Sequence, residues 1–406
     1  MLDLLLVTVG LLGLVVAALS ERLRHYPVSE PLLGLLAGVL LGPQVLGALD
    51  LPSLTETHDQ MHEGTRVLLA VSVMAVALRY PVSGLRRRIR PVLLLLAVAM
   101  PAMATVSAGL TWAILGVPFT LALLVGAAVA PTDPVLASSV VTGDLAERDL
   151  PAKDRELLSL ESGANDGLAL PLVLGAVAFA GTTTGVDAAL ESLWQVASAS
   201  VLGVALGWLG GRALRYGEQH GAAEHGPVLL LTVVLALGVL GLSGIVRADG
   251  IFAVFVAGLT FNLVSSGNDR SEELSIDEAV NRFAVLPLFV ALGAMLPWAE
   301  WGDLGWPGVL LVVAVLALRR LPVLILLAAP LGLKVRDALY LGWFGPIGVS
   351  ALFYVTMEAD RVHLPAVVPA VGALLVAAST LVHGLTSAPG RVLYRRTARR
   401  GVPLPT

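Results

Sequence analysis

Long apolar segments recur along the entire chain and leave only short polar connections between them. Because the hydrocarbon core of a bilayer is about 30 Å thick, a helix needs about 20 apolar residues to cross it. About thirteen segments meet or approach that length, and they cover residues 2–20, 32–49, 67–78, 91–115, 119–141, 157–180, 193–214, 228–246, 250–264, 283–296, 307–331, 339–357 and 364–388. The sequence therefore predicts an all-α polytopic membrane protein.

The composition agrees with this class and excludes several others. Of the 406 residues, 56% are hydrophobic and 14% are charged, whereas a soluble domain carries about 25% charged residues. There is no cysteine, which excludes disulfides and thiolate metal sites. No polar stretch is long enough for a soluble module, so residues 1–390 are expected to form a single membrane domain, with no cofactor and no nucleic-acid partner. The first segment lacks the features of a signal peptide and is expected to be a retained helix.

The positive charges indicate how the chain is oriented. Apart from a pair at 319–320, nearly all of the 26 Lys and Arg residues lie in alternate connections, and only Arg66, Arg247 and Arg361 lie in the others. Cytoplasmic loops are enriched in Lys and Arg, so the N-terminus is expected outside and the C-terminus in the cytoplasm. This predicts a multi-pass protein of the cell membrane, with a short basic cytoplasmic tail at 391–406.

Two apolar segments contain residues that interrupt a helix in mid-membrane. In the fifth, Pro131 and Pro134 flank a Thr-Asp pair, and the twelfth contains WFGPIGVSALFY at 343–354. A proline removes an amide donor and clashes with the preceding turn. If helices 1–6 and 8–13 are two inverted six-helix repeats joined by helix 7, the breaks occupy corresponding positions, as in transporter binding sites. We expect the broken helices 5 and 12 to cross in the core; two ordinary proline kinks are the alternative.

Polar side chains that cannot easily reach water collect around these breaks. They are Thr132, Asp133, Glu161, Ser162, Asn165, Asp166, Arg319 and Arg320. A charged side chain near the bilayer centre costs about 2.5–3.5 kcal/mol on insertion scales, so such a cluster indicates a functional site. Ser162, Asn165 and Asp166 are three or four residues apart and share one helix face, whereas Glu161 points about 140° away from Asp166. One carboxylate can therefore serve the site while the other serves the structure.

The oxygen atoms of this face suit a hard monovalent cation such as Na⁺. Asp166, Ser162 and Thr132 offer carboxylate and hydroxyl ligands, together with carbonyls freed by the broken helix. A proton and a cation each neutralise the carboxylate, so they compete for it and can be exchanged. Because Asn165 is uncharged, one cation is expected to exchange for one proton without net movement of charge.

The other charged residues each have alternative roles. Asp133 either joins the cation and proton site or accepts a hydrogen bond from the Asn165 amide and fixes the crossing of two helices. Glu161 needs a positive partner if it is ionised, and Arg319 and Arg320 are the cations in the middle of a helix. Three further acids are interpreted as helix-end charges that reach water: Asp187, Glu191 and Glu358.

These motifs resemble those of the monovalent cation:proton antiporters, specifically the NhaP-type sodium/proton antiporters. The resemblance rests on TDP at 132–134, ESxxND at 161–166, LRRLPV at 318–323 and GIFAVFVAGLTFN at 250–262, and it extends over essentially the whole chain. It implies a membrane transporter that is not an enzyme. The transporter would exchange Na⁺, or alternatively K⁺ or Li⁺, for H⁺ across the lipid membrane and serve pH homeostasis.

The resemblance also implies a role for each residue of the cluster. Asp166 would be the exchanging carboxylate, with Ser162 and Thr132 as cation ligands. Asp133 with Asn165 would form the helix crossing, and Glu161 would pair with an arginine. The usual spacing to Val323 favours Arg319 as that arginine, but Arg320 is adjacent. The Asn-Asp pair resembles the electroneutral branch. The third helix departs from many members of the family, because VSVMAVALRY at 71–80 has no acidic residue.

Members of this family are homodimers in which a core of six helices moves against a dimerising scaffold. By resemblance, the transporting core comprises about residues 91–180 and 306–388, and the scaffold comprises about residues 1–80 and 226–300. A linking helix is expected over about 191–216.

Three alternatives remain open at the level of sequence. A K⁺/H⁺ antiporter of the same fold uses the same ligand types, and a channel requires a continuous polar pore. An intramembrane serine hydrolase is the alternative from another class, since GLSG at 241–244 contains Ser243 and a later helix contains His383. His58 and His62 lie in an acidic connection and suit either a weak divalent site or a solvated loop.

Overall fold

The computed structural model describes residues 2–19, 28–79, 85–181, 183–221, 230–265, 283–362 and 364–400. Within these ranges every regular element is a helix. Each apolar segment expected from the sequence lies on one helix or on consecutive helices, and six helices of the described chain are long and apolar enough to cross a membrane. The prediction of an all-α polytopic membrane protein is confirmed.

The first half of the chain forms α1 (Leu2–Ala18), α3 (Glu30–Leu41), α4 (Asp59–Arg79), α5 (Leu85–Leu94), the π-helical turn η2 (Leu95–Ala99), α6 (Met100–Leu115), α7 (Phe119–Ala128), α8 (Pro134–Val141), α9 (Gly143–Asp149), α10 (Ala152–Leu168) and α11 (Leu170–Phe179). The second half forms α12 (Gly185–Gln219), α14 (Leu231–Val246), α15 (Gly250–Val264), a helix over Phe283–Ala294, α17 (Trp298–Leu318), α18 (Leu321–Leu326), α19 (Val335–Trp343), α20 (Val349–Arg361) and α21 (Val367–Arg400).

Both expected helix breaks are present, and two more occur. The fifth segment divides into α7 and α8, and the twelfth divides into α19 and α20. The sixth segment divides between α10 and α11 just before Pro171, and the eleventh divides between α17 and α18 just before Pro322. A proline has no N–H for the carbonyl four residues earlier. Each of the two additional breaks therefore leaves carbonyls that need other donors.

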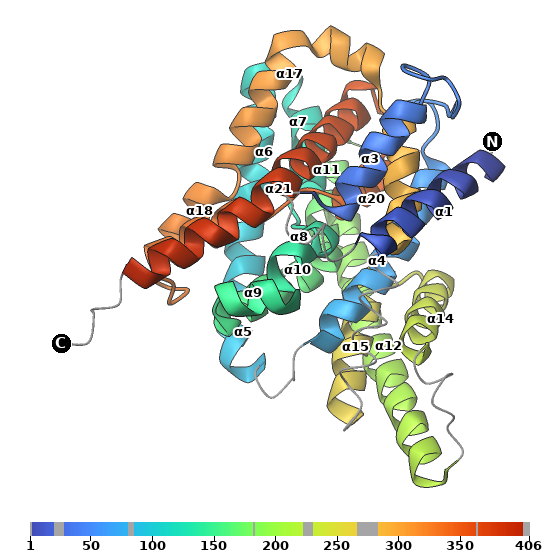
Figure 1. Cartoon of the computed structure of the whole chain (residues 1–406), viewed down its shortest axis with the longest axis vertical. Coiled ribbons are helices and arrows are strands. Elements are labelled where there is room, and N and C mark those ends of the chain that lie inside the picture. The colour runs from blue at the N-terminus through green and yellow to red at the C-terminus, as the bar shows by residue number, and fades with distance from the viewer. Residues whose placement is uncertain are drawn as a thin grey trace.

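Helices α7, α8, α10, α11 and α20 lie in the middle of the molecule, and α21 packs across α7, α8 and α20 (Figure 1). Helices α12, α14 and α15 pack against one another at one end. Their close approach follows from a row of small residues on α12: a Cβ atom at Gly203 would lie 2.6 Å from the Ala253 carbonyl oxygen, and one at Gly207 would lie 2.3 Å from that of Ala257. Such small-residue rows allow membrane helices to approach closely. The range expected for a linking helix, about 191–216, lies within α12, and its role as a link stays a prediction.

The basic segment after residue 390 begins as a continuation of α21, which runs to Arg400; residues 401–406 lie outside the described ranges. Tyr394 on this extension donates a hydrogen bond to Asp337 at 2.8 Å, and Lys153 approaches the other oxygen of the same carboxylate at 3.1 Å. Arg395 pairs with Asp149 at 3.1 Å. These contacts hold the end of α21 against the end of α9 and the start of α19, and Lys153 joins the start of α10 to α19.

Candidate functional site

The two broken helices meet at their breaks, where Asp133 joins them. Its backbone N–H donates to the carbonyl of Pro346 at 3.0 Å. Its carboxylate accepts the backbone N–H groups of Val135 and Leu136 on α8, at 2.7 and 2.9 Å, and that of Val349 at the start of α20. The first turn of a helix has amides without intrahelical partners and a partial positive charge, so it stabilises an anion. Asp133 therefore caps two helices at once.

Arg319 binds backbone carbonyls at the same crossing. Its guanidinium donates to four carbonyls in the two breaks: those of Val129, Ala130, Pro131 and Gly345. In a continuous helix the Ala130 carbonyl would meet the N–H of residue 134, which is a proline. Carbonyls at the end of a helix carry partial negative charge, which offsets the buried guanidinium. Asp133 and Arg319 thus satisfy opposite ends of the interrupted helices.

Two glycines of the second break are required by close approaches. A Cβ atom at Gly345 would lie 2.2 Å from Cδ of Arg320, and one at Gly348 would lie 2.5 Å from Oδ2 of Asp133. Both distances are far shorter than a carbon atom tolerates. The glycines of WFGPIG therefore admit two charged side chains to the crossing.

Replacing Gly348 by Ala is expected to lower the free energy of unfolding by about 1–3 kcal/mol, the usual cost of overpacking. The new methyl group displaces the Asp133 carboxylate from the amide of Val349. Gly175→Ala on α11 is the control, because its Cβ would have no neighbour within 4 Å and alanine favours a helix. Thermal unfolding in detergent compares the two variants, and equal melting temperatures would contradict this packing argument.

Asn165 connects the first break to α10. Its Nδ2 donates to Thr132 Oγ1 at 2.8 Å, and its Oδ1 accepts the backbone N–H of Thr132 at 3.3 Å. Thr132 Oγ1 in turn lies 3.2 Å from Ser162 Oγ. The sequence suggested Asp133 as the partner of the Asn165 amide. The structure gives Asn165 a different partner, because backbone amides already engage the Asp133 carboxylate.

Glu161 pairs with Arg320. The two oxygens of the carboxylate lie 2.5 and 2.6 Å from Nη1 and Nη2, and Nε donates to the Leu341 carbonyl at 3.0 Å. This two-bond arrangement is the strongest common geometry of an arginine–carboxylate pair. The sequence left Arg319 and Arg320 as alternatives. Neighbouring residues on a helix point about 100° apart, so Arg320 reaches Glu161 while Arg319 reaches the carbonyls of the breaks.

Asp166 is fully buried, and neither carboxylate oxygen has a hydrogen-bond partner among the described residues. The Ser350 hydroxyl at the start of α20 interacts with this carboxyl group, although the pair does not reach good hydrogen-bond geometry. A buried polar group normally has partners, so each exception needs an explanation. Asp166 differs in this respect from Asp133 and Glu161, whose oxygens are engaged.

Tyr354, on α20, supports the backbone beneath Asp166. Its hydroxyl donates to the Asp166 carbonyl and lies 3.2 Å from that of Gly167. In a continuous helix the Gly167 carbonyl would meet residue 171, a proline that lacks an N–H. Sequence reasoning missed Ser350 and Tyr354. They stand one helical turn apart in the quoted stretch WFGPIGVSALFY, and this spacing is the signal that could have found them.

The structure brings all eight residues of the expected cluster into one buried region, each at most 2% exposed: Thr132, Asp133, Glu161, Ser162, Asn165, Asp166, Arg319 and Arg320. Most are engaged with each other or with the backbone of the breaks. Asp166 is the cluster carboxylate that lacks such partners within the described ranges. The arrangement therefore leaves one carboxylate open to a proton or a cation.

The residues considered for a serine hydrolase do not form a catalytic pair. The Ser243 hydroxyl donates to the Val239 carbonyl one turn earlier on α14, at 2.7 Å. His383 on α21 contacts Ser379 on its own helix and the Trp343 carbonyl. Each of the two side chains thus has a local partner that explains it.

Other acids and histidines are placed as follows. Asp187 and Glu191 are exposed or half-exposed, as expected of helix-end charges. Glu358 contradicts its interpretation as a charge that reaches water, because it is fully buried and both oxygens lack partners in the described part of the chain. His58 pairs with Asp360 at 3.1 Å, and His62 contacts the Thr356 hydroxyl at 3.0 Å.

Comparison with known proteins identifies the family of this chain. The family described as sodium/hydrogen exchanger, transmembrane, matches residues 9–390. The Na(+)/H(+) antiporter 2 of Zygosaccharomyces rouxii is 32% identical over 341 residues, which cover 80% of this chain and 42% of that protein. The K(+)/H(+) antiporter NhaP2 of Shewanella sp. (strain MR-4) is 25% identical over 346 residues, or 82% of this chain and 58% of that protein. The chain thus spans about half the length of these curated relatives.

A solved structure shares the fold. The sodium proton antiporter MjNhaP1 from Methanocaldococcus jannaschii at pH 8 matches with a TM-score of 0.73 and 20% identity, covering 98% of this chain and 96% of that chain. At this identity the match establishes the architecture. Together with the sequence match to the family over residues 9–390, it excludes the hydrolase alternative. The chain belongs to the sodium/hydrogen exchanger family of transmembrane transporters.

Proposed function

We propose that the protein exchanges a monovalent cation, Na⁺ in the first place, for a proton at Asp166. The observation that carries this proposal is the Asp166 carboxylate, fully buried and without a hydrogen-bond partner among the described residues. An unpaired buried charge is costly, so the carboxylate takes up either a proton or a cation. Ser162, on the same face of α10, and Thr132, which contacts it, are the proposed additional ligands.

One cation is exchanged for one proton. Glu161 is neutralised by Arg320, and Asp133 is held by backbone amides of two helices. Asn165 has no charge. Asp166 is therefore the carboxylate whose charge is balanced by transported ions, and transport is electroneutral. Asp133 serves the cation site indirectly, by fixing the break that carries Thr132.

The transporting core comprises about residues 91–180 and 306–388, and it moves against a scaffold of about 1–80 and 226–300. The polar contacts described above support a rigid core, because they join α7, α8, α10, α19 and α20 within these ranges. Helix α12 links the two parts. The protein is a homodimer of the cell membrane, with its N-terminus outside and its C-terminus in the cytoplasm, and it serves pH homeostasis.

K⁺ is the second candidate cation. The ligands at the site are oxygens of a carboxylate and of hydroxyl groups, which suit Na⁺, K⁺ and Li⁺ alike. Among the similar proteins, one from Zygosaccharomyces rouxii is named a Na(+)/H(+) antiporter and one from Shewanella a K(+)/H(+) antiporter. Na⁺ is the first proposal because the relative named for Na⁺ is more similar to this chain.

Proton movement in proteoliposomes tests this function. A Na⁺ gradient is expected to drive a pH change at the same rate whether the membrane voltage is clamped at zero or at a negative value by an ionophore. A K⁺ gradient is applied separately. A rate that follows the voltage would overturn the electroneutral exchange. If neither cation moves protons, the proposal of cation/proton exchange is wrong.

A further inference from the structure

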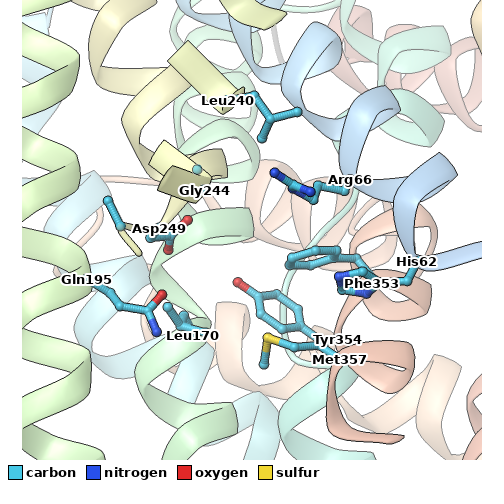
Figure 2. A pocket seen from close by; sticks show the side chains of 12 residues that line it. His62, Arg66, Leu170, Gln195, Leu240, Gly244, Asp249, Phe353, Tyr354 and Met357 are labelled. Atoms are coloured by element: carbon cyan, nitrogen blue, oxygen red, sulfur yellow. The ribbon is translucent and has the colours of Figure 1, made fainter. Parts of the chain in front are cut away.

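A cavity of about 240 Å³ lies beside the site, between α4, α11, α12, α14, α15 and α20 (Figure 2). It lies at the face of the membrane that is expected to be outside. Since about 10–15 Å³ of such volume is enough for one water, the cavity has room for an ion together with several waters. Its wall includes Asp249, Gln195 and Tyr354.

Asp249 directs one carboxylate oxygen into this cavity without a partner. The residue lies in the connection between α14 and α15, and its Oδ1 accepts the Phe252 amide at 3.0 Å, which caps α15. Its Oδ2 is buried and has no hydrogen-bond partner in the described ranges, while the whole side chain is only 6% exposed. In Figure 2 the carboxylate faces the Tyr354 hydroxyl across the cavity. Capping of α15 accounts for the position of Oδ1 and does not account for the buried, unpartnered Oδ2.

Two other side chains with an oxygen atom that could bind a cation line the same cavity. Gln195 donates its amide N–H to Glu191 at 2.8 Å, which turns its amide oxygen away from that carboxylate. Tyr354 has its ring in the wall, and its hydroxyl donates to the Asp166 carbonyl. A carboxylate, an amide oxygen and a phenol oxygen are ligands that hard monovalent cations accept. The cavity therefore offers a cation site one side chain away from Asp166.

Two basic side chains also line the cavity, His62 and Arg66. Arg66 is paired with Glu63 at 2.9 Å, so its charge is already balanced. His62 stacks on Phe353 and contacts the Thr356 hydroxyl. Burial raises the pKa of the Asp249 carboxyl to about 7.

We propose that Asp249 forms a second monovalent-cation site, at which Na⁺ from the cavity face is held before it passes Tyr354 and reaches Asp166. The inference rests on the proposed exchange at Asp166 and adds a binding step on one side of the membrane. A site on the entry path raises the cation concentration near the exchanging carboxylate. It therefore affects the KM for cation at the cavity face and not at the opposite face.

Asp249→Asn separates this role from helix capping. Asparagine keeps the acceptor that caps α15 and removes the charge. In proteoliposomes of one orientation, the KM for Na⁺ at the cavity face is expected to rise about tenfold, as the loss of one nearby, weakly screened charge produces, while the KM at the opposite face stays constant. Asp187→Asn is the control, since it removes an exposed carboxylate at the start of α12 that does not line the cavity. Equal KM values for Asp249→Asn and wild type at the cavity face would overturn the proposal.

A binding measurement keeps this test independent of transport. Na⁺ is expected to raise the melting temperature of Asp166→Asn, because the second site remains, and to leave Asp166→Asn/Asp249→Asn unchanged relative to choline. If Na⁺ stabilises Asp166→Asn no more than choline does, the proposal of a second site is wrong. Failure of the exchange proposal is distinct, because it is recognised from the absence of cation-driven proton movement in the wild type.

Discussion

Asp166→Asn abolishes cation-driven proton movement, which is the largest effect we expect from any single substitution in this protein. The amide can neither release a proton nor balance a cation, so the competition on which exchange depends disappears. Two opposite charges about 4 Å apart interact by about 4 kcal/mol at an effective dielectric constant of 20. That energy corresponds to a loss of affinity of about a thousandfold. Proton flux driven by Na⁺ in proteoliposomes is the measurement.

Folding provides the internal control for this variant. The Asp166 carboxylate makes no hydrogen bond with the described residues, so its replacement breaks no hydrogen bond there. Without added cation, the melting temperature of Asp166→Asn is therefore expected to equal or exceed that of the wild type. Normal exchange by Asp166→Asn would show that the cluster is structural and that the proton and cation are exchanged elsewhere.

The location of the site could be predicted from the sequence because its signals are local. Pro131 and Pro134 forbid a continuous helix whatever surrounds them. The spacing of Ser162, Asn165 and Asp166 fixes a shared face on any α-helix. The apolar length of the segments fixes the fold class. These rules concern neighbours along the chain, and the structure agrees with them.

The partners within the site could not be predicted because they depend on contacts between distant residues. Arg319 and Arg320 are adjacent, but one side chain reaches the carbonyls of the breaks and the other reaches Glu161. Neighbouring residues on a helix point about 100° apart, and the sequence does not show which partner lies in which direction. Asp133 finds amides of α20, more than 200 residues away. Spacing rules describe a regular helix and do not apply where the helix ends.

Glu358 and Asp249 show the same limit for single acids. Glu358 follows an apolar run and resembles a helix-end charge, yet α21 and neighbouring helices bury it fully. Asp249 precedes a helix and resembles an ordinary cap. Its capping role is real, but the second oxygen faces a cavity formed by five other helices as well as its own. Capping is visible in sequence, whereas a cavity exists only after the helices have packed.

The second large effect concerns the buried pair of Glu161 and Arg320. Glu161→Gln is expected to lower the free energy of unfolding by about 3–5 kcal/mol, because it leaves the Arg320 guanidinium buried without its counter-charge. Arg320→Gln is expected to cost a similar amount for the opposite charge. Both residues are at most 2% exposed, so water cannot replace the lost partner. Thermal or denaturant unfolding in detergent measures these losses.

The double variant Glu161→Gln/Arg320→Gln separates the charge pair from packing. With both charges removed, the uncompensated buried charge disappears, and the double variant is expected to be more stable than either single variant. Arg319→Gln with Glu161→Gln is the matched comparison, since Arg319 donates to backbone carbonyls and not to Glu161. The losses of stability caused by Arg319→Gln and by Glu161→Gln are therefore expected to add in that double variant. If stability is recovered in Glu161→Gln/Arg319→Gln and not in Glu161→Gln/Arg320→Gln, then Glu161 pairs with Arg319 and our assignment of Arg320 is wrong.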